Sequence, residues 1–242
     1  MSLNLFEETG DGIRLPHPPI SLRSLLVIES ALCHAWRLIR EKPRSSFNLA
    51  TADEDNITLE LHERLYDEVF DKSVIDGFDR NVFASVGREP KIRNFNRTHP
   101  DKMPDLLFQF ADRPAGVLYS QHGVFTECKP VDDAHAVGTH YCDKGIIRFI
   151  EGDYAWTMTS ALMIGYARSG YTILPKLPTA LASASRIKKI PTLTAPQPCK
   201  RSKVSLTNEV VHVSQHQRTF KYVENGKDAP AITIRHLWLK RD

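Results

Sequence analysis

Several features that define common protein classes are missing from this 242-residue sequence. It has no run of about 18 apolar residues, the length that a membrane-spanning helix needs, so we expect no membrane association. The N-terminal segment carries acidic residues where a signal peptide would have a basic segment followed by an apolar one. These two absences predict a cytoplasmic protein.

Cysteines and several catalytic motifs are also scarce or missing. Cys33, Cys128, Cys142 and Cys199 are scattered without a CxxC pair, which argues against a zinc cluster or a disulfide framework and predicts reduced, mostly buried thiols. The chain has no HExxH and no GxSxG motif. It also lacks a GxxxxGK[ST] phosphate loop, so ATP hydrolysis is not expected.

Acidic residues are absent from one long segment. None occurs from Tyr154 to Asn208, whereas nine lie between Asp53 and Asp76, in a chain whose net charge is only +3. The basic segment would attract a polyanion such as nucleic acid, although a solvated basic loop without a partner is the alternative. Its candidate nucleic-acid-binding residues are Arg186, Lys188, Lys189, Lys200, Arg201 and Lys203.

The composition is that of an ordinary globular protein. The hydrophobic fraction of 41% and the charged fraction of 25% suit one large domain, which we place over residues 1–242. Apolar residues at spacings of three and four predict a helix over 21–42 with Ser21 as its N-cap. The same spacing predicts a second helix over 54–73, capped by Asp55 or Asn56.

The middle of the chain changes to a strand pattern. Residues 81–103 are polar and rich in turn formers, so we expect an irregular segment with at most a short strand. Short apolar runs predict strands at 105–110 and within 117–131, the latter ended by Pro130. Helical spacing returns over 140–170, which predicts two consecutive helices.

The last third mixes loop and strand signals. Residues 172–203 are rich in Pro, Ser, Thr and Ala and predict an extended basic loop. Alternating apolar residues on both sides of a turn at Glu224 to Gly226 predict a closing hairpin over 209–239. The order of elements indicates a mixed α/β domain.

One short stretch, FTECK at residues 125–129, combines charges with a buried-strand pattern. Side chains alternate along a strand, so Glu127 and Lys129 share one face and Cys128 points to the other. Asp105 opens the strand that precedes this one. Because a hairpin or meander returns the chain beside itself, we expect Asp105 and Glu127 to meet next to Lys129. A surface ion pair is the alternative.

These residue types suit one kind of chemistry. Two carboxylates, Asp105 and Glu127, together with a backbone carbonyl offer hard oxygen ligands to Mg²⁺, for which Mn²⁺ would substitute. A lysine beside such a site can orient a water molecule and help it lose a proton. The second acid-x-lysine triplet, Glu89-Pro90-Lys91, contains a proline that a central strand disfavours.

Pro104-Asp105, followed by a strand, a turn and Glu127-Cys128-Lys129, resembles the active-site motif of the PD-(D/E)xK superfamily of restriction-endonuclease-like nucleases. The resemblance implies a restriction-endonuclease-like core over about 55–165, with a central mixed β-sheet flanked by helices. It also implies that Asp105, Glu127 and the Cys128 carbonyl bind the ion, that Lys129 activates water, and that the Cys128 side chain lies in the core.

The same resemblance implies an acid on the preceding helix and cations on the following one. Glu60 fits the first role, with Glu54 or Glu63 as substitutes. Lys144 and Arg148 fit the second, since residues four apart share a helical face. His216 and Arg218, which alternate on the strand after 209, are further candidates for contacting phosphate.

Taken together, the motif predicts a magnesium-dependent DNA endonuclease of a restriction, phage-defence, mobile-element or repair system, and a homodimer is a reasonable expectation. A non-catalytic nucleic-acid-binding or assembly subunit with the same fold is the alternative. Tyr154, Trp156 and Tyr166 are expected to be core residues rather than platforms for stacking bases.

Overall fold

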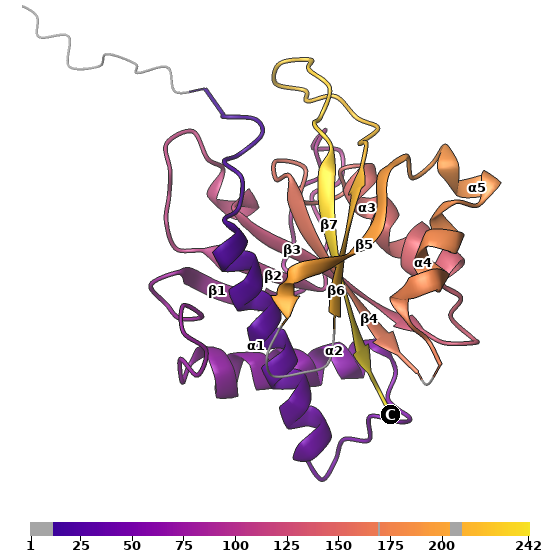
Figure 1. Cartoon of the computed structure of the whole chain (residues 1–242). Coiled ribbons are helices and arrows are strands. Elements are labelled where there is room, and N and C mark those ends of the chain that lie inside the picture. Colours follow the sequence, from indigo (N-terminus) through magenta and orange to yellow (C-terminus); the bar gives the residue numbers. More distant parts are fainter. Residues whose placement is uncertain (1–11, 169, 204–209) are drawn as a thin grey trace, which may run out of the picture.

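The computed structural model describes residues 12–168, 170–203 and 210–242, which form one seven-stranded mixed sheet with helices on both faces (Figure 1). The strand order is β1-β2-β3-β4-β7-β6-β5. The strands are β1 (Phe83–Arg88), β2 (Leu106–Phe110), β3 (Gly123–Val131), β4 (Ser160–Ala167), β5 (Thr192–Lys203), β6 (Val210–His216) and β7 (Ile232–Lys240). The expected α/β class and the central mixed sheet are therefore confirmed.

The centre of the sheet is parallel and its two sides are antiparallel. Strands β3, β4 and β7 run parallel to one another, while β1 and β2 continue from β3, and β6 and β5 continue from β7, in antiparallel pairs. The register joins Leu106 to Thr126, so β2 has no further paired residue beside β3 beyond that point. The last residues of β3 thus lie in an open notch at the start of β2.

Helices cover both faces and bury the sheet between two apolar layers. One layer holds α1 (Leu22–Glu41), α2 (Glu54–Glu63) and the π-helical η1 (Arg64–Phe70). The other layer holds the π-helical η3 (Val137–Ile146), α3 (Ile147–Ile150), α4 (Ile173–Leu181) and α5 (Ala184–Ile187). A 3₁₀ turn, η2 (Tyr119–Gln121), precedes β3. Neighbouring strand residues enter opposite layers. Leu107 packs with η3 and Phe108 with α1, as the alternation of a strand requires.

Several expected elements are confirmed. Ser21 caps α1, since its hydroxyl accepts a 3.0 Å hydrogen bond from the backbone N–H of Ser24. The second helix forms, but its cap is Asp53, two or three residues earlier than expected. The Asp53 carboxylate accepts a hydrogen bond from the N–H of Asn56. The expected C-terminal hairpin is present as the antiparallel pair β6–β7, although residues 217–231 make a longer connection than a tight turn.

The second of the two helices expected over 140–170 is wrong. Residues Ser160–Ala167 form β4, whose two neighbours β3 and β7 both run parallel to it, and all of its residues after Ser160 are buried. A strand buried on both faces has no polar alternation, so its apolar run also satisfies a helical pattern. The first helix is confirmed as η3 and α3.

The extended loop expected at 172–203 is also wrong, because this segment folds into α4, α5 and the edge strand β5. Its prolines suggested irregular structure, yet Pro178 lies within α4 and Pro198 lies on an edge strand, where a missing N–H is tolerated. The segment 81–103 contains one short strand, β1, which agrees with the expectation of an irregular segment with at most a short strand.

Pro130 does not end β3, which continues to Val131. On the β4 side Pro130 still pairs with Tyr166, while β2 has no paired residue beside it on the other side. A proline fits there because the N–H that it lacks has no neighbouring strand to bond.

Gly145 brings η3 close to the sheet beneath the notch. A Cβ atom at this position would lie 2.6 Å from the Met163 Cε and 3.4 Å from the Lys129 Cγ, which is too close for the first contact. The glycine therefore lets the helix reach the residues of the notch. Among the described residues, no helix has the length and apolar character to cross a membrane.

Candidate active site

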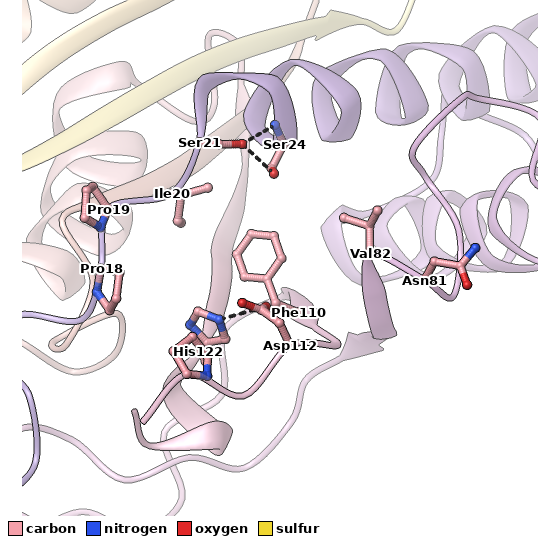
Figure 2. Close-up of a pocket in the computed structure, with 11 residues that line it drawn as sticks. Pro18, Pro19, Ile20, Ser21, Ser24, Asn81, Val82, Phe110, Asp112 and His122 are labelled. Carbon is pink, nitrogen blue, oxygen red and sulfur yellow. Dashed lines mark hydrogen bonds and ion pairs between the residues drawn. The ribbon is translucent and has the colours of Figure 1, made fainter. Parts of the chain in front are cut away.

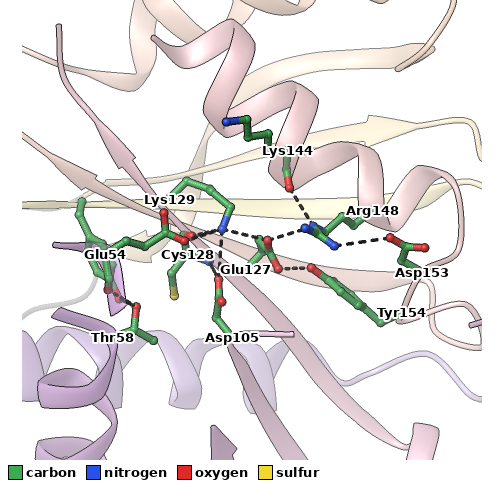
Figure 3. Close-up of polar contacts among 11 residues, drawn as sticks. Glu54, Thr58, Asp105, Glu127, Cys128, Lys129, Lys144, Arg148, Asp153 and Tyr154 are labelled. Carbon is green, nitrogen blue, oxygen red and sulfur yellow. Dashed lines mark hydrogen bonds and ion pairs between the residues drawn. The ribbon is translucent and has the colours of Figure 1, made fainter. Parts of the chain in front are cut away.

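Asp105, Glu127 and Lys129 meet at the open notch between β2 and β3, as the sequence predicts (Figure 3). Asp105 stands immediately before β2, and the pairing of Leu106 with Thr126 brings it opposite Glu127. Glu127 and Lys129 lie two residues apart on β3 and project to the same side. Local strand geometry alone therefore assembles the centre of the site.

The ammonium group of Lys129 lies among four oxygen atoms. Its Nζ is 2.6 Å from the Glu54 Oε1, 3.0 Å from the Glu127 Oε1 and 3.6 Å from the Asp105 Oδ2. It also donates a 2.7 Å hydrogen bond to the carbonyl oxygen of Cys128. Three carboxylates and one carbonyl thus converge on a single positive charge.

Backbone contacts hold Asp105 in this position. The N–H of Cys128 donates a 2.6 Å hydrogen bond to the Asp105 Oδ2, so β3 itself orients the carboxylate. The Cys128 side chain is fully buried in the apolar layer beneath α1, which confirms that it is a core residue.

Glu127 is held by two further side chains. It is 2% exposed, its Oε2 accepts a hydrogen bond from the Tyr154 hydroxyl, and its Oε1 lies 3.3 Å from the Arg148 Nε (Figure 3). Arg148 also lies 3.6 Å from Asp153. Tyr154 is buried, as expected of a core aromatic residue, but its contact with Glu127 is a role that the sequence did not reveal.

Burial and mutual repulsion shift the acidity of these groups. Burial, followed by the charge of Asp105, raises the pKa of Glu127 to about 7 against the opposing effects of Lys129, Tyr154 and Arg148. Burial likewise raises the pKa of Asp105 and of Glu54. For Lys129, burial acts to lower the pKa, but the surrounding carboxylates outweigh it and raise the pKa.

Burial is the largest cause of the raised pKa of each acid, and repulsion among acids that share one ammonium group adds to it. Lys129 therefore stays protonated at neutral pH and acts as a cation and hydrogen-bond donor. Glu127 gains or loses its proton near neutral pH.

Glu60 is not part of this site, contrary to the expectation for the helix acid. It is buried in ion pairs with Arg64 at 2.8 Å and with Arg44 at 3.3 Å, and Glu63 pairs with Arg44 as well. Six residues separate Glu60 from Glu54, which turns the side chain about 120° away around the helix. Glu54, at the first turn of α2, holds the position instead.

The cations expected on the following helix border the site. Lys144 and Arg148 line a pocket of about 570 Å³ together with Lys129, Arg168 and Arg241, and we call this the basic pocket. Arg148 donates from its Nε to the Lys144 carbonyl at 2.9 Å.

The other expected cations do not gather here. Arg186 is paired with Asp143 at 2.8 Å, and Lys188 and Lys189 are exposed after α5. Lys200, Arg201 and Lys203 belong to β5, and their side chains lie outside the described part of the chain.

His216 and Arg218 are wrong as phosphate contacts because both are buried. His216 is bonded to the Ser214 hydroxyl at 2.7 Å. Arg218 is 4% exposed and donates to the carbonyls of Pro230 and Trp156. His216 ends β6 and Arg218 follows it, and both side chains point into the protein.

The donor set of the site fits a hard cation. The oxygens of Glu54, Asp105, Glu127 and the Cys128 carbonyl already surround one positive charge, and carboxylate and carbonyl oxygens are the ligands that Mg²⁺ prefers. In the part of the chain that the structure describes, no three His, Cys, Asp or Glu side chains are grouped closely enough to hold a metal by themselves. The ammonium group lies between the acids, so a dication would take its place.

A second pocket, of about 400 Å³, lies at the opposite end of β2 (Figure 2). Its lining includes Ile20, Phe110 and an ion pair between Asp112 and His122 at 3.1 Å. It shares no residue with the notch and contains none of the predicted catalytic groups.

Comparisons with protein-family models, with curated proteins and with solved structures found no match for this chain. The functional argument therefore rests on the geometry of its own residues.

Proposed function

We propose that this protein is a magnesium-dependent nuclease of the PD-(D/E)xK type that hydrolyses phosphodiester bonds in DNA. The observation that carries the proposal is the convergence of Glu54, Asp105, Glu127 and the Cys128 carbonyl on one cation, at distances of 2.6 to 3.6 Å from the Lys129 Nζ. Acids and a lysine in this arrangement at a sheet notch suit hydrolysis of an anionic ester.

The sheet supports the same proposal at the level of the fold. The motif spans an antiparallel pair, β2 and β3, next to the parallel pair β3 and β4, with a helical layer on each face. This is the arrangement that a restriction-endonuclease-like core would have around its catalytic acids.

Asp105, Glu127 and the Cys128 carbonyl would hold the divalent ion, and Glu54 adds a fourth oxygen from α2. When bound, the ion supplies positive charge for the phosphate oxygens and lowers the pKa of a coordinated water. Hydrolysis forms a bond from the water oxygen to phosphorus and breaks the bond from phosphorus to the departing strand.

Lys129 is suited to orient the water and the phosphate rather than to accept a proton. The carboxylates keep it charged, so its N–H groups donate to oxygen atoms. Glu127, whose pKa is about 7 without the ion, must lose its proton to bind the ion. Tyr154 and Arg148 fix its two oxygens.

The basic pocket supports a nucleic acid as the substrate. Cations from β3, η3, α3 and the C-terminus line one cavity directly beside the acids. Positive charge beside a metal site complements the phosphate backbone.

Cleavage of linear DNA in Mg²⁺, with circular plasmid compared in parallel, tests the proposal. We expect cleavage by the wild-type protein and a loss of about a hundredfold or more in Lys129→Ala and Glu127→Gln. Glu60→Gln is the matched control, because it removes a buried acid of the same helical layer that does not contact Lys129. Equal cleavage by the wild type and Lys129→Ala would refute the assignment.

A further inference from the structure

The basic pocket has more positive charge than the catalytic chemistry needs. Its cationic lining residues come from separate parts of the chain and are Lys129, Lys144, Arg148, Arg168 and Arg241. Three acids line it, namely Asp53, Glu54 and Asp132. Lys129 and Arg148 also contact the acids of the notch, so Lys144, Arg168 and Arg241 are the cations that the pocket adds.

Two of the arginines build a rigid wall. Arg241 donates from its Nη2 to the carbonyls of Leu49 at 2.8 Å and Ala52 at 2.7 Å, and Arg168 donates to that of Ala50 at 2.7 Å. These bonds fix the segment before α2, which also carries Glu54 into the notch. The two arginines therefore help to position Glu54, one of the acids of the notch.

The opposite wall offers polar groups at the mouth. Lys144 is exposed, and His140 lies one helical turn before it on η3, with its ring 5.0 Å from that of His135. His135 is itself paired with Asp132 at 2.7 Å. Lys144, which is exposed, and His140, which is half-buried, are thus lining groups that a ligand can reach.

The electrostatics of the pocket agree with this excess of positive charge. Burial and then the neighbouring charges of Lys144 and His135 lower the pKa of His140. Burial and then Arg168 lower the pKa of Arg241. Like charges are held together here, which an anionic ligand would relieve.

We propose that the basic pocket binds the terminal phosphate and nucleotide of a nucleic-acid strand, so that the strand end lies beside the catalytic acids. A volume of about 570 Å³ is that of a small-ligand pocket and exceeds what a bare phosphate needs. A terminal phosphate carries a charge of about −1.5 to −2, so it gains more from the added cations Lys144, Arg168 and Arg241 than the single charge of an internal diester does.

This inference rests on the proposed function and deepens it, because it names a phosphorylated strand end as the substrate. It favours cleavage next to an end over the internal cleavage that the motif resemblance implies. The 5′ and the 3′ phosphate share the recognising chemistry, and the experiment separates them.

Binding in EDTA tests the pocket without any cleavage. Fluorescent DNA oligonucleotides carrying a 5′-phosphate, a 3′-phosphate or only hydroxyl ends are titrated, with unlabelled circular DNA as competitor. We expect the wild type to bind one phosphorylated end about tenfold more tightly than the hydroxyl end. Circular DNA should compete weakly.

The variant that tests the lining is Lys144→Gln combined with His140→Gln. It should reduce the ratio of affinities for the phosphorylated and the hydroxyl end to about one. Lys227→Gln is the control, since it removes an exposed lysine from the loop before β7. Arg241 of the pocket follows the other end of β7, and a strand of nine residues is about 30 Å long. Lys227→Gln should keep the full preference.

Equal wild-type affinity for phosphorylated and hydroxyl ends would overturn the inference. So would a double variant that weakens binding of phosphorylated, hydroxyl-ended and circular DNA by the same factor, which would indicate general backbone contact. Because the titration contains no divalent ion, its outcome is independent of whether the protein cleaves DNA.

Discussion

Replacing Lys129 with methionine should destabilise the protein, and by an amount that grows with pH. The substitution keeps the length of the side chain but removes the cation whose charged atom contacts Glu54, Asp105 and Glu127. Three carboxylates would then face one another at the notch. Lys227→Met, at an exposed position, is the matched control.

The size of the stability loss depends on how deeply the ion pair of Lys129 and Glu127 is buried. The side chains of Lys129 and Glu127 are 11% and 3% exposed, and removing one partner of a buried ion pair costs about 3–5 kcal/mol. Protonation of Glu127 limits that cost at low pH. We therefore expect a loss of about 3 kcal/mol at pH 9 and a smaller loss at pH 6.

The sign of the pH dependence can be worked out from Glu127. Its folded-state pKa, raised by burial, lies above the unfolded value, so the folded state binds more protons and stability falls as pH rises from 4.5 to about 7. Without Lys129 this pKa rises further, and the fall should continue above pH 7. In the wild type the stability should level off above pH 7.

Urea unfolding at pH 6 and pH 9 measures the free energy of unfolding of the wild type and of Lys129→Met. The reasoning would be refuted by a variant that matches the wild type within about 0.5 kcal/mol at both values, which is the range of ordinary surface substitutions. A loss that shrinks as pH rises would refute the assignment of the effect to unpaired carboxylates.

Three further predictions follow from single contacts. Glu54→Gln should reduce metal-dependent DNA cleavage about a hundredfold, while Glu60→Gln should keep it within a few fold in the same assay. Tyr154→Phe removes the hydroxyl donor to Glu127, so the pH–rate profile should move to higher pH, and an unchanged profile would exclude this positioning role. Burial lowers the pKa of His216 to about 4, so stability should fall by about 3 kcal/mol from pH 6.5 to 4, and this part of the slope should disappear in His216→Gln.

The centre of the site was predictable because it depends on short-range geometry. Alternation along β3 puts Glu127 and Lys129 on one face, and the antiparallel return of the chain brings Asp105 opposite. Neither relation requires knowledge of distant segments.

The supporting residues were not predictable in the same way. Glu54 and Tyr154 reach the site from α2 and from the loop before β4, and only the packing of the helical layers on the sheet decides which acid or aromatic residue faces the notch. A helical wheel shows that Glu54 and Glu60 face different directions. It does not show which of them points to β3.

The errors in the fold have two physical causes. Residues Ser160–Ala167 are apolar throughout because β4 is central and parallel, which removes the alternation that marks a strand. Residues 172–203 contain prolines that suggested a loop, although a proline within a short helix or on an edge strand is compatible with both elements.

The central claim is that Asp105 and Glu127 hold a divalent ion in the place that the Lys129 ammonium group occupies. Calorimetric titration with Mg²⁺ and with Mn²⁺, on the wild type and on Asp105→Asn, tests it most directly. The account predicts binding of one ion to the wild type and its loss in Asp105→Asn. Binding that is absent from the wild type, or equal in both proteins, would contradict it.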